Sequence, residues 1–277
     1  MSEATYNLSQ GYDRLAAEML YAYMDGCPAD ELAFYERHIR SNGGTALDQA
    51  CGTGRHLFPL LKRGLDIQGA DASADALRLA RRKAAESQCD AIAKAQMRLQ
   101  LYHQRMEDFE VTSKYGTIYI PNGSFHLISD RQQALNTLKR FWRHLNPGGQ
   151  LLIDMVIPAE VMEFCRTRNA ENPQRWGPAP RKCGEGEIST TLWTESFDLF
   201  EQTLVERRRY ELHVDGQLAR SELHTLHMRW YHKYEIIMML QQVGFEEIFL
   251  YGDYTENPAT KDSKTIICGA RRPRKST

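Results

Sequence analysis

Apolar and polar positions form two patterns along this chain, which are short apolar runs and longer stretches with helical spacing. Between Thr45 and Ile157 the two patterns alternate, and the helical stretches include Ala74–Ala85 and Arg131–Leu145. Such an alternation is typical of a parallel sheet with helices on both faces. The sequence therefore predicts an α/β core in this part of the chain.

The segment before the core has helical spacing alone. Leu15, Met19 and Tyr23 fall on one stripe of a helix, and the sequence Gly-Cys-Pro at residues 26–28 interrupts it. A second helix is expected from about Asp30, because aspartate is a common helix N-cap. The pattern predicts a helical leader that covers the core.

A different pattern begins after Pro158. Residues 169–187 are rich in proline and glycine, and residues 187–231 resemble strands with a hairpin turn at Asp215-Gly216. A helix over Lys233–Gln242 and strands near residues 245–251 and 265–270 then return to the core pattern. We therefore expect four parts, which are an N-terminal helical cap (1–42), a core (43–157 and 232–271), an inserted antiparallel β lid (158–231) and a basic tail (272–277).

The composition and charge of the chain exclude some classes of binding partner. The chain has 277 residues, 42% hydrophobic and 26% charged, and its net charge of −1 gives no field that would recruit a nucleic acid. No apolar stretch approaches the ~20 residues of a membrane helix, and the N-terminus is too polar for a signal peptide. We expect a cytoplasmic protein with neither a nucleic-acid nor a membrane partner, either a monomer or a homodimer.

The six cysteines form no C-x-x-C pair and no metal-like spacing with histidine. Reduced, mostly structural thiols suit this pattern. We therefore expect neither a disulfide nor a metal site.

The segment ALDQACGTGR, residues 46–55, carries the main chemical signal. An apolar strand runs into a turn with Gly52 and Gly54, where the absence of a Cβ lets the backbone approach a ligand closely. A helix is expected to begin near Arg55 and to direct its positive end at the same spot. The segment does not match the dinucleotide-binding motif G-x-G-x-x-G, because Leu57 stands at the position of the third glycine. It does not match a phosphate-binding loop either, because the sequence Gly-Lys-Ser/Thr is absent.

This segment resembles motif I of the class I S-adenosylmethionine-dependent methyltransferases, a strand that ends in an acidic residue, here Asp48, before a G-x-G turn. Downstream, LDIQGAD (65–71) resembles a second strand that ends in a carboxylate, able to accept hydrogen bonds from a ribose. Segments 102–109, 117–122 and 145–154 resemble the family's next strands and turns in order. The resemblance implies a doubly wound, mostly parallel seven-stranded sheet whose last two strands pair antiparallel at one edge.

The resemblance also implies S-adenosyl-L-methionine as cofactor. The glycine turn would meet the methionine moiety, Arg55 its carboxylate, Asp71 the ribose, and Met106 with Glu107 the adenine. The family's adenine loop commonly reads Asp-Met, but this chain has Arg105-Met106, so either Glu107 substitutes or the backbone alone reads the base; Met106 could also simply fill core space. The cofactor-binding residues implied in this way are Asp48, Ala50, Gly52, Gly54, Arg55, Asp71, Ala72, Met106, Glu107, Pro121 and Asn122.

For the acceptor, residues 121–130 resemble the fourth-strand loop of the glycine and aminosugar N-methyltransferases. His126 is the candidate base because histidine titrates near neutrality, with a capping or packing role as the alternative. Tyr12 resembles an acceptor-facing tyrosine of that group, with a half-buried aromatic stripe as the alternative. The implied substrate-binding residues are Tyr23, Ser124, Arg229 and Tyr231.

These residues favour methyl transfer to a small-molecule acceptor, most simply an amine, with specificity set by the lid. Methyl transfer needs mainly an aligned acceptor, so the lack of a catalytic triad is expected. Two alternatives stay open, namely an RNA or protein methyltransferase and a catalytically silent domain that binds the cofactor.

Overall fold

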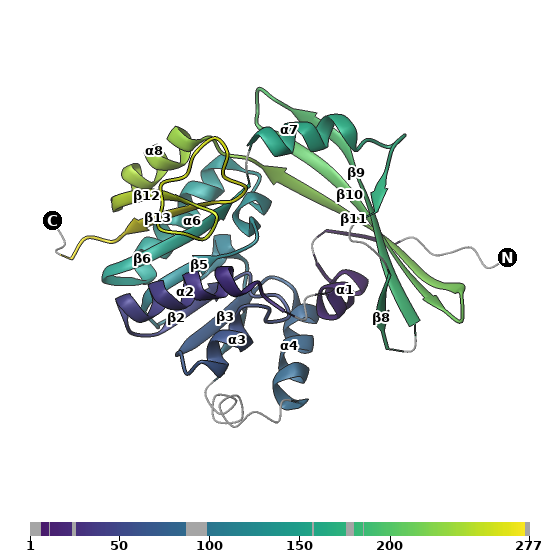
Figure 1. The fold of residues 1–277 in the computed structure, drawn as a ribbon, viewed down its shortest axis with the longest axis horizontal. Helices are drawn as coiled ribbons and strands as arrows, with labels where there is room; N and C mark the ends of the chain where they lie inside the picture. Colours follow the sequence, from purple (N-terminus) through teal and green to yellow (C-terminus); the bar gives the residue numbers. More distant parts are fainter. Residues whose placement is uncertain are drawn as a thin grey trace.

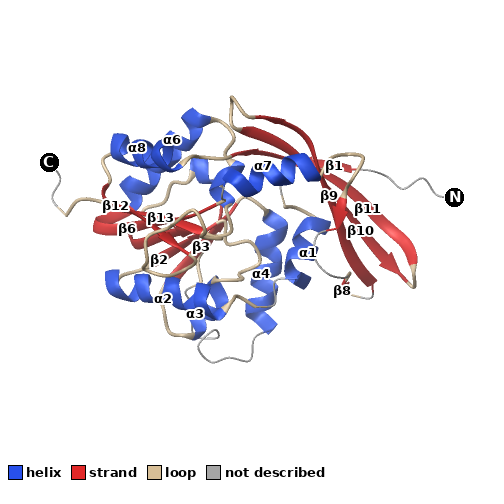
Figure 2. Cartoon of the chain, turned by 45° about the horizontal axis from the view of Figure 1, so that its top comes forward, coloured by secondary structure: helices blue, strands red, loops and turns tan. Residues whose placement is uncertain are grey.

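The computed structural model describes residues 7–10, 12–23, 26–86, 99–156, 158–175, 180–184 and 186–274. It contains a layered α/β body and a long twisted antiparallel sheet that projects from it (Figure 1). The helices lie on both sides of the layered body, and α1 and α7 lie along the projecting sheet (Figure 2). No described helix is long and apolar enough to cross a membrane.

The body is built on seven strands in the order β12-β13-β6-β5-β2-β3-β4. Strands β6, β5, β2, β3 and β4 run parallel to one another. β13 is antiparallel to β6, and β12 is antiparallel to β13. The predicted doubly wound sheet and its antiparallel edge are confirmed. The bounds are β2 Ala46–Gln49, β3 Ile67–Asp71, β4 Leu101–His103, β5 Tyr115–Ile120, β6 Leu145–Met155, β12 Glu246–Gly252 and β13 Ile266–Arg271.

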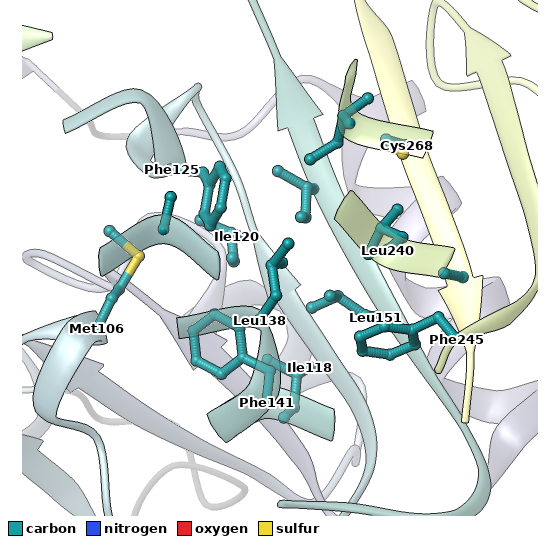
Figure 3. Close-up of a cluster of buried hydrophobic side chains, with 14 of the residues drawn as sticks. Met106, Ile118, Ile120, Phe125, Leu138, Phe141, Leu151, Leu240, Phe245 and Cys268 are labelled. Atoms are coloured by element: carbon teal, nitrogen blue, oxygen red, sulfur yellow. The ribbon is translucent and has the colours of Figure 1, made fainter. Parts of the chain in front are cut away.

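Alternate residues of the central strands enter two separate apolar cores. Ile118 and Ile120 of β5 pack with α6 and α8 in one core, part of which is drawn in Figure 3, whereas Tyr119 enters the other core with α2 and α3. Burial on both faces explains why these strands read as continuous apolar runs. The helices of the body are α2 Ala29–Asn42, α3 Leu57–Lys62, α4 Ala74–Glu86, α6 Arg131–His144 and α8 Lys233–Val243.

The second sheet has the order β1-β11-β10-β9-β7, and β8 also pairs with β9. The predicted hairpin lies between β10 and β11, where Asp215 and Gly216 have φ of 50° and 75°, as a two-residue turn of this hand requires. A short N-terminal strand, β1, adds in parallel to β11, which no local pattern predicted. The bounds are β1 Asn7–Gln10, β7 Gln174–Arg175, β8 Arg181–Cys183, β9 Gly186–Asp198, β10 Thr203–Val214 and β11 Gln217–Arg229.

Two further helices join the sheets. α1 (Leu15–Tyr23) packs Leu15 and Met19 against Tyr210 of β10, and α7 (Pro158–Thr167) packs against Leu204 and Trp230 at the other end. The middle of this lid face, between α1 and α7, carries polar side chains.

Several element ends differ from the sequence-based expectation. α2 begins at Ala29 after Pro28, which has no side-chain cap, so Asp30 lies inside the first turn. α3 begins at Leu57 because residues 52–56 form turns, and it has only six residues. α6 ends at His144, where Leu145 is already extended, and β6 starts at Leu145 and includes residues 147–149.

Candidate functional site

The glycine turn leaves open space at one position only. Ala50, Gly52 and Gly54 all have positive φ, of 61°, 53° and 88°. A Cβ on Gly54 would lie 2.2 Å from the ring of Phe58, whereas a Cβ on Gly52 would meet no atom within 4 Å. Gly54 is therefore required by packing within the protein, and Gly52 borders a space that a ligand can enter.

Asp71, at the end of β3, ties this turn to the next one. Its carboxylate accepts hydrogen bonds from the backbone N–H of Gly52 (2.8 Å) and of Ser73 (2.7 Å). Burial raises the pKa of Asp71, although these two donors lower it. The neighbouring Ala72 is exposed, and its carbonyl pairs with Nε2 of His103 (3.0 Å). The carboxylate thus organises the backbone at the place where the sequence predicted a ribose partner.

Asp48 lies fully buried in β2. Burial raises the pKa of Asp48 well above its usual range, although hydrogen bonding from the Tyr119 hydroxyl and the Leu57 N–H lowers it. Asp48 is therefore enclosed by the protein below the glycine turn.

Arg55 crosses from the glycine turn to two other segments. Its guanidinium donates to Oδ1 of Asn122 (2.5 Å) and to Oε2 of Glu31 in α2 (3.2 Å). The other Glu31 oxygen, Oε1, lies 2.5 Å from Nε2 of His56. Burial would raise the pKa of Glu31, but His56 and Arg55 hold it below its usual value, and burial lowers the pKa of His56. The sequence had not predicted Glu31 or His56 as members of this group.

Asp154, at the end of β6, is a second residue that the sequence analysis missed. Its Oδ2 accepts hydrogen bonds from the Asn122 N–H (2.9 Å) and the Tyr254 hydroxyl (2.8 Å). Burial raises the pKa of Asp154 to about 7. Asn122 itself has φ of 57°, so Asp154 holds a backbone conformation that few residues adopt.

This raised pKa predicts a pH-dependent stability. Between its usual pKa and about 7, Asp154 takes up a proton on folding, so its contribution to stability is present at low pH and is lost as pH rises through about 7. Asp154→Asn keeps an oxygen acceptor for both donors and stays neutral. Between about pH 5 and about pH 8, the melting temperature of the parent should therefore fall more steeply than that of the variant. Parallel curves would contradict this assignment.

In the predicted adenine loop, Met106 is buried, Glu107 is partly buried and Arg105 is exposed. Met106 is buried in the apolar cluster of Figure 3, which corresponds to the alternative of a core-filling methionine. Glu107 pairs with Arg105 (2.7 Å). The carbonyl of Pro121 accepts from the Ser124 hydroxyl (2.9 Å), so Ser124 closes its own turn.

His126 is placed differently from the prediction. It is fully buried, its Nδ1 lies 2.7 Å from the Arg229 carbonyl, and its Nε2 accepts from the Val156 N–H at 2.9 Å. Burial lowers the pKa of His126 to about 4. Both ring nitrogens are engaged by the backbone, so this geometry supports the packing alternative, in which His126 joins the lid to the core, and the general-base role stays a prediction.

His126→Ala should therefore lower the free energy of unfolding by about 2–4 kcal/mol, since it leaves two buried backbone groups unpaired beside a cavity. Thermal and denaturant unfolding measure this loss. The pH dependence of turnover per folded molecule should stay that of the parent. Unchanged stability with a 10²–10⁴-fold loss of kcat, the effect of a lost general base, would support the general-base role instead.

The predicted acceptor-side residues lie in two places, Tyr12 beside the lid strand β10, and Arg229 and Tyr231 at the end of the lid that meets α8 and the core. The Tyr12 hydroxyl accepts from Arg208 of β10 (2.9 Å), and Arg208 also pairs with Glu206 (2.5 Å) on the same strand. Arg229 is largely buried near Glu235 (3.9 Å), and Tyr231 is buried with its hydroxyl on the Ile128 carbonyl (3.3 Å). Tyr23 ends α1, and its side chain lies outside the described residues. Tyr12 thus reaches the lid, whereas Tyr231 points into the core.

A hydrogen-bonded path joins the two halves of this site. The hydroxyl of Ser73 donates to the Asp13 carboxylate (2.7 Å) and contacts the Tyr12 carbonyl (3.0 Å), while the Ser73 N–H binds Asp71. The segment that carries Tyr12 is therefore anchored to the carboxylate that organises the glycine turn.

Comparison with known proteins identifies the chemistry of this site. Residues 46–149 match the methyltransferase domain family. The chain is 24% identical over 260 residues to the cypemycin N-terminal methyltransferase of a Streptomyces species, covering 92% of this chain and 95% of that protein. It is 26% identical over 227 residues to the glycine/sarcosine N-methyltransferase of Halorhodospira halochloris, covering 80% and 73%.

Solved structures agree on the fold. An S-adenosylmethionine-dependent methyltransferase from Clostridium acetobutylicum superposes with a TM-score of 0.72 at 15% identity, over 92% of this chain and 96% of that one. The sugar N-methyltransferase KedS8 from Streptoalloteichus gives 0.65 at 17% identity, over 88% and 87%. These comparisons support a class I S-adenosylmethionine-dependent methyltransferase. This is the kind of enzyme that the sequence motifs predicted.

The residues present fit the cofactor of this methyltransferase. Open space at Gly52 adjoins a partly buried carboxylate, Asp71, which accepts from the Gly52 N–H in the same turn. When bound there, S-adenosylmethionine supplies a methyl group on a positively charged sulfur. The individual contacts of the eleven cofactor-binding residues stay predictions.

Proposed function

We propose that this methyltransferase methylates the amine nitrogen of a small molecule in the cytoplasm. Its similarity to an N-terminal amine methyltransferase extends over 92% of the chain and therefore includes the lid as well as the core. The glycine/sarcosine relative, which also acts on an amine, covers 80% of the chain. Both relatives support an amine acceptor, and the near-neutral charge of the chain gives no support for RNA.

The observation that carries the proposal is the polar group formed by Tyr12, Arg208 and Glu206. Arg208 and Glu206 lie on β10 of the lid, where their side chains are 15% and 16% exposed, and the Tyr12 hydroxyl reaches Arg208 from the segment before α1. Charged groups so far from bulk solvent suit the recognition of a small polar molecule. A carboxylate and a guanidinium side by side suit an acceptor that carries an amine and an anionic or hydroxyl group.

Methyl transfer requires little acid–base catalysis from Tyr12, Arg208 and Glu206. The bound cofactor already carries an activated methyl group, so the enzyme has to hold the acceptor nitrogen in line with it and exclude water. Tyr12 is suited to this task because its backbone is anchored to Ser73, next to Asp71. When a neutral amine accepts the methyl group, the product nitrogen becomes positively charged. It then loses one proton to water or to a modest base.

Arg208→Lys tests the acceptor site. Loss of the planar fork should raise the KM of the acceptor by at least about 10-fold, equivalent to about 1.4 kcal/mol, with cofactor affinity within a few-fold of the parent. Arg207→Lys is the matched control, because Arg207 lies on the same strand but on the opposite face, paired with Glu195 (2.8 Å). Equal effects of the two substitutions on KM would overturn the placement of the acceptor.

A panel of acceptors tests the substrate class. It contains free amino acids, amino sugars, a short peptide with a free N-terminus, the N-acetylated form of each, and a structured RNA. Turnover of a small free amine and none of its acetylated form is the expected result. Turnover of the peptide alone would favour the protein alternative, and turnover of RNA would contradict the proposal.

A further inference from the structure

Three potential metal ligands from separate segments meet beside the glycine turn. Cys27 precedes α2, Glu31 lies in its first turn, and His56 follows the glycine turn. One donor atom from each lies within 4.8 Å of the other two, and within the described residues these are the three donors that form such a group. Glu31 and His56 are 3% and 2% exposed, and Cys27 is partly exposed, so an ion has a route from solvent.

The donor set is suited to zinc. A thiolate, an imidazole and a carboxylate are all zinc ligands, and three protein ligands leave one position for water. In a tetrahedral site the donor atoms stand about 3.3–3.6 Å apart. The Glu31–His56 pair, now at 2.5 Å, has to open by about 1 Å, whereas the Cys27 sulfur already lies within 4.8 Å of both partners. Side-chain rotation supplies movements of this size.

The surroundings also orient the ligands. Arg55 binds Oε2 of Glu31 (3.2 Å), which leaves Oε1 for the ion, and the Tyr35 ring packs edge-on against His56 with centroids 5.5 Å apart. Hydrogen bonds and packing of this kind fix ligand geometry in metal sites. With a thiolate and a carboxylate as ligands, the charge of Zn²⁺ is balanced, so Arg55 keeps its pairing with Glu31.

We propose that Cys27, Glu31 and His56 bind one Zn²⁺ ion. On binding, the Cys27 thiol releases its proton to water, and His56 exchanges its proton from Nε2, where it faces Glu31, to Nδ1 through water, so that Nε2 is free to coordinate the ion. The ion would fasten the segment before α2 to the turn that precedes α3. This role goes beyond methyl transfer and does not depend on which acceptor is used.

Zinc and cobalt titration of the full-length, metal-stripped protein tests this proposal. Zinc should bind in a one-to-one ratio in competition with a chelating dye, and should raise the melting temperature. Cobalt should give the thiolate-to-metal absorption band that reports a cysteine ligand. Cys27→Ser should lower zinc affinity by at least about 100-fold and remove the cobalt band.

Cys183→Ser is the matched control. Cys183 also pairs with a glutamate, Glu18, at 3.6 Å, but it belongs to no three-donor group among the described residues, so its loss should leave zinc affinity and the band unchanged. Glu31→Gln gives a second, near-isosteric test if Cys27→Ser is poorly folded. Failure of the parent to bind zinc, or equal binding by the Cys27 and Cys183 variants, would reduce the cluster to a hydrogen-bonded network and overturn the proposal.

Discussion

Gly52→Val is expected to lower S-adenosylmethionine affinity by at least about 100-fold, or about 2.7 kcal/mol, while the chain stays folded. A Cβ at Gly52 meets no protein atom within 4 Å, so the valine side chain starts in the open space that borders the glycine turn. There it competes with the cofactor. Gly52→Ala should give an intermediate loss, because a single methyl group fills less of that space. Calorimetric titration with S-adenosylhomocysteine measures both.

The control for this prediction is Gly64→Val. Gly64 also has positive φ, 78°, and no atom within 4 Å of a Cβ, but it lies in the turn after α3. Both substitutions therefore carry the strain of a left-handed conformation, which costs about 1–2 kcal/mol, and only one should affect the cofactor. Equal affinities in folded Gly52→Val and Gly64→Val would remove Gly52 from the cofactor site.

Asp71→Ala is the second substitution with a large expected effect. It removes the acceptor for the N–H groups of Gly52 and Ser73, and with them the order of the glycine turn and the anchor of the Tyr12 segment. Hydrogen bonds to a charged group contribute about 1.5–3 kcal/mol each. We therefore expect loss of measurable cofactor binding together with a lower melting temperature, in calorimetry and thermal unfolding.

Two further variants serve as comparisons for Asp71→Ala. Asp71→Asn keeps one oxygen acceptor and should retain weak binding. Asp66→Ala removes a carboxylate that accepts from the Thr45 hydroxyl (2.6 Å) just before β3, on the surface, and should leave the affinity unchanged. If Asp71→Ala binds the cofactor as the parent does, neither the ribose prediction nor the organising role of Asp71 holds.

Local patterns predicted the core well because its strands are buried on both faces. β5 reads as an apolar run since Ile118 and Tyr119 face different cores, and the hairpin at Asp215 follows from two residues that tolerate positive φ. β1 was missed because its partner, β11, is more than 200 residues away and no local signal marks a four-residue edge strand.

The site was predicted less well for a related reason. A sequence motif gives the type of a residue but not its hydrogen-bond partners. In His126 both ring nitrogens are hydrogen-bonded to the backbone, one to Val156 and the other to Arg229. Asp154 lay in a recognised strand, yet its raised pKa depends on burial under Tyr254, 100 residues away. The spacing of Cys27 and Glu31 by one helical turn was visible in the sequence, but only the fold brings His56 to them.

The fate of the methyl group tests the central claim most directly. The protein is incubated with S-adenosylmethionine labelled with ¹³C in the transferred methyl group and with the small amine that turns over best in the acceptor panel, and the product is examined by NMR. Methyl carbons on nitrogen, oxygen and sulfur resonate in separate regions. We expect the label on the amine nitrogen of the small molecule, with one S-adenosylhomocysteine formed per methyl transferred. Label on oxygen or sulfur, or recovered only in unreacted cofactor while the protein binds it, would contradict the account.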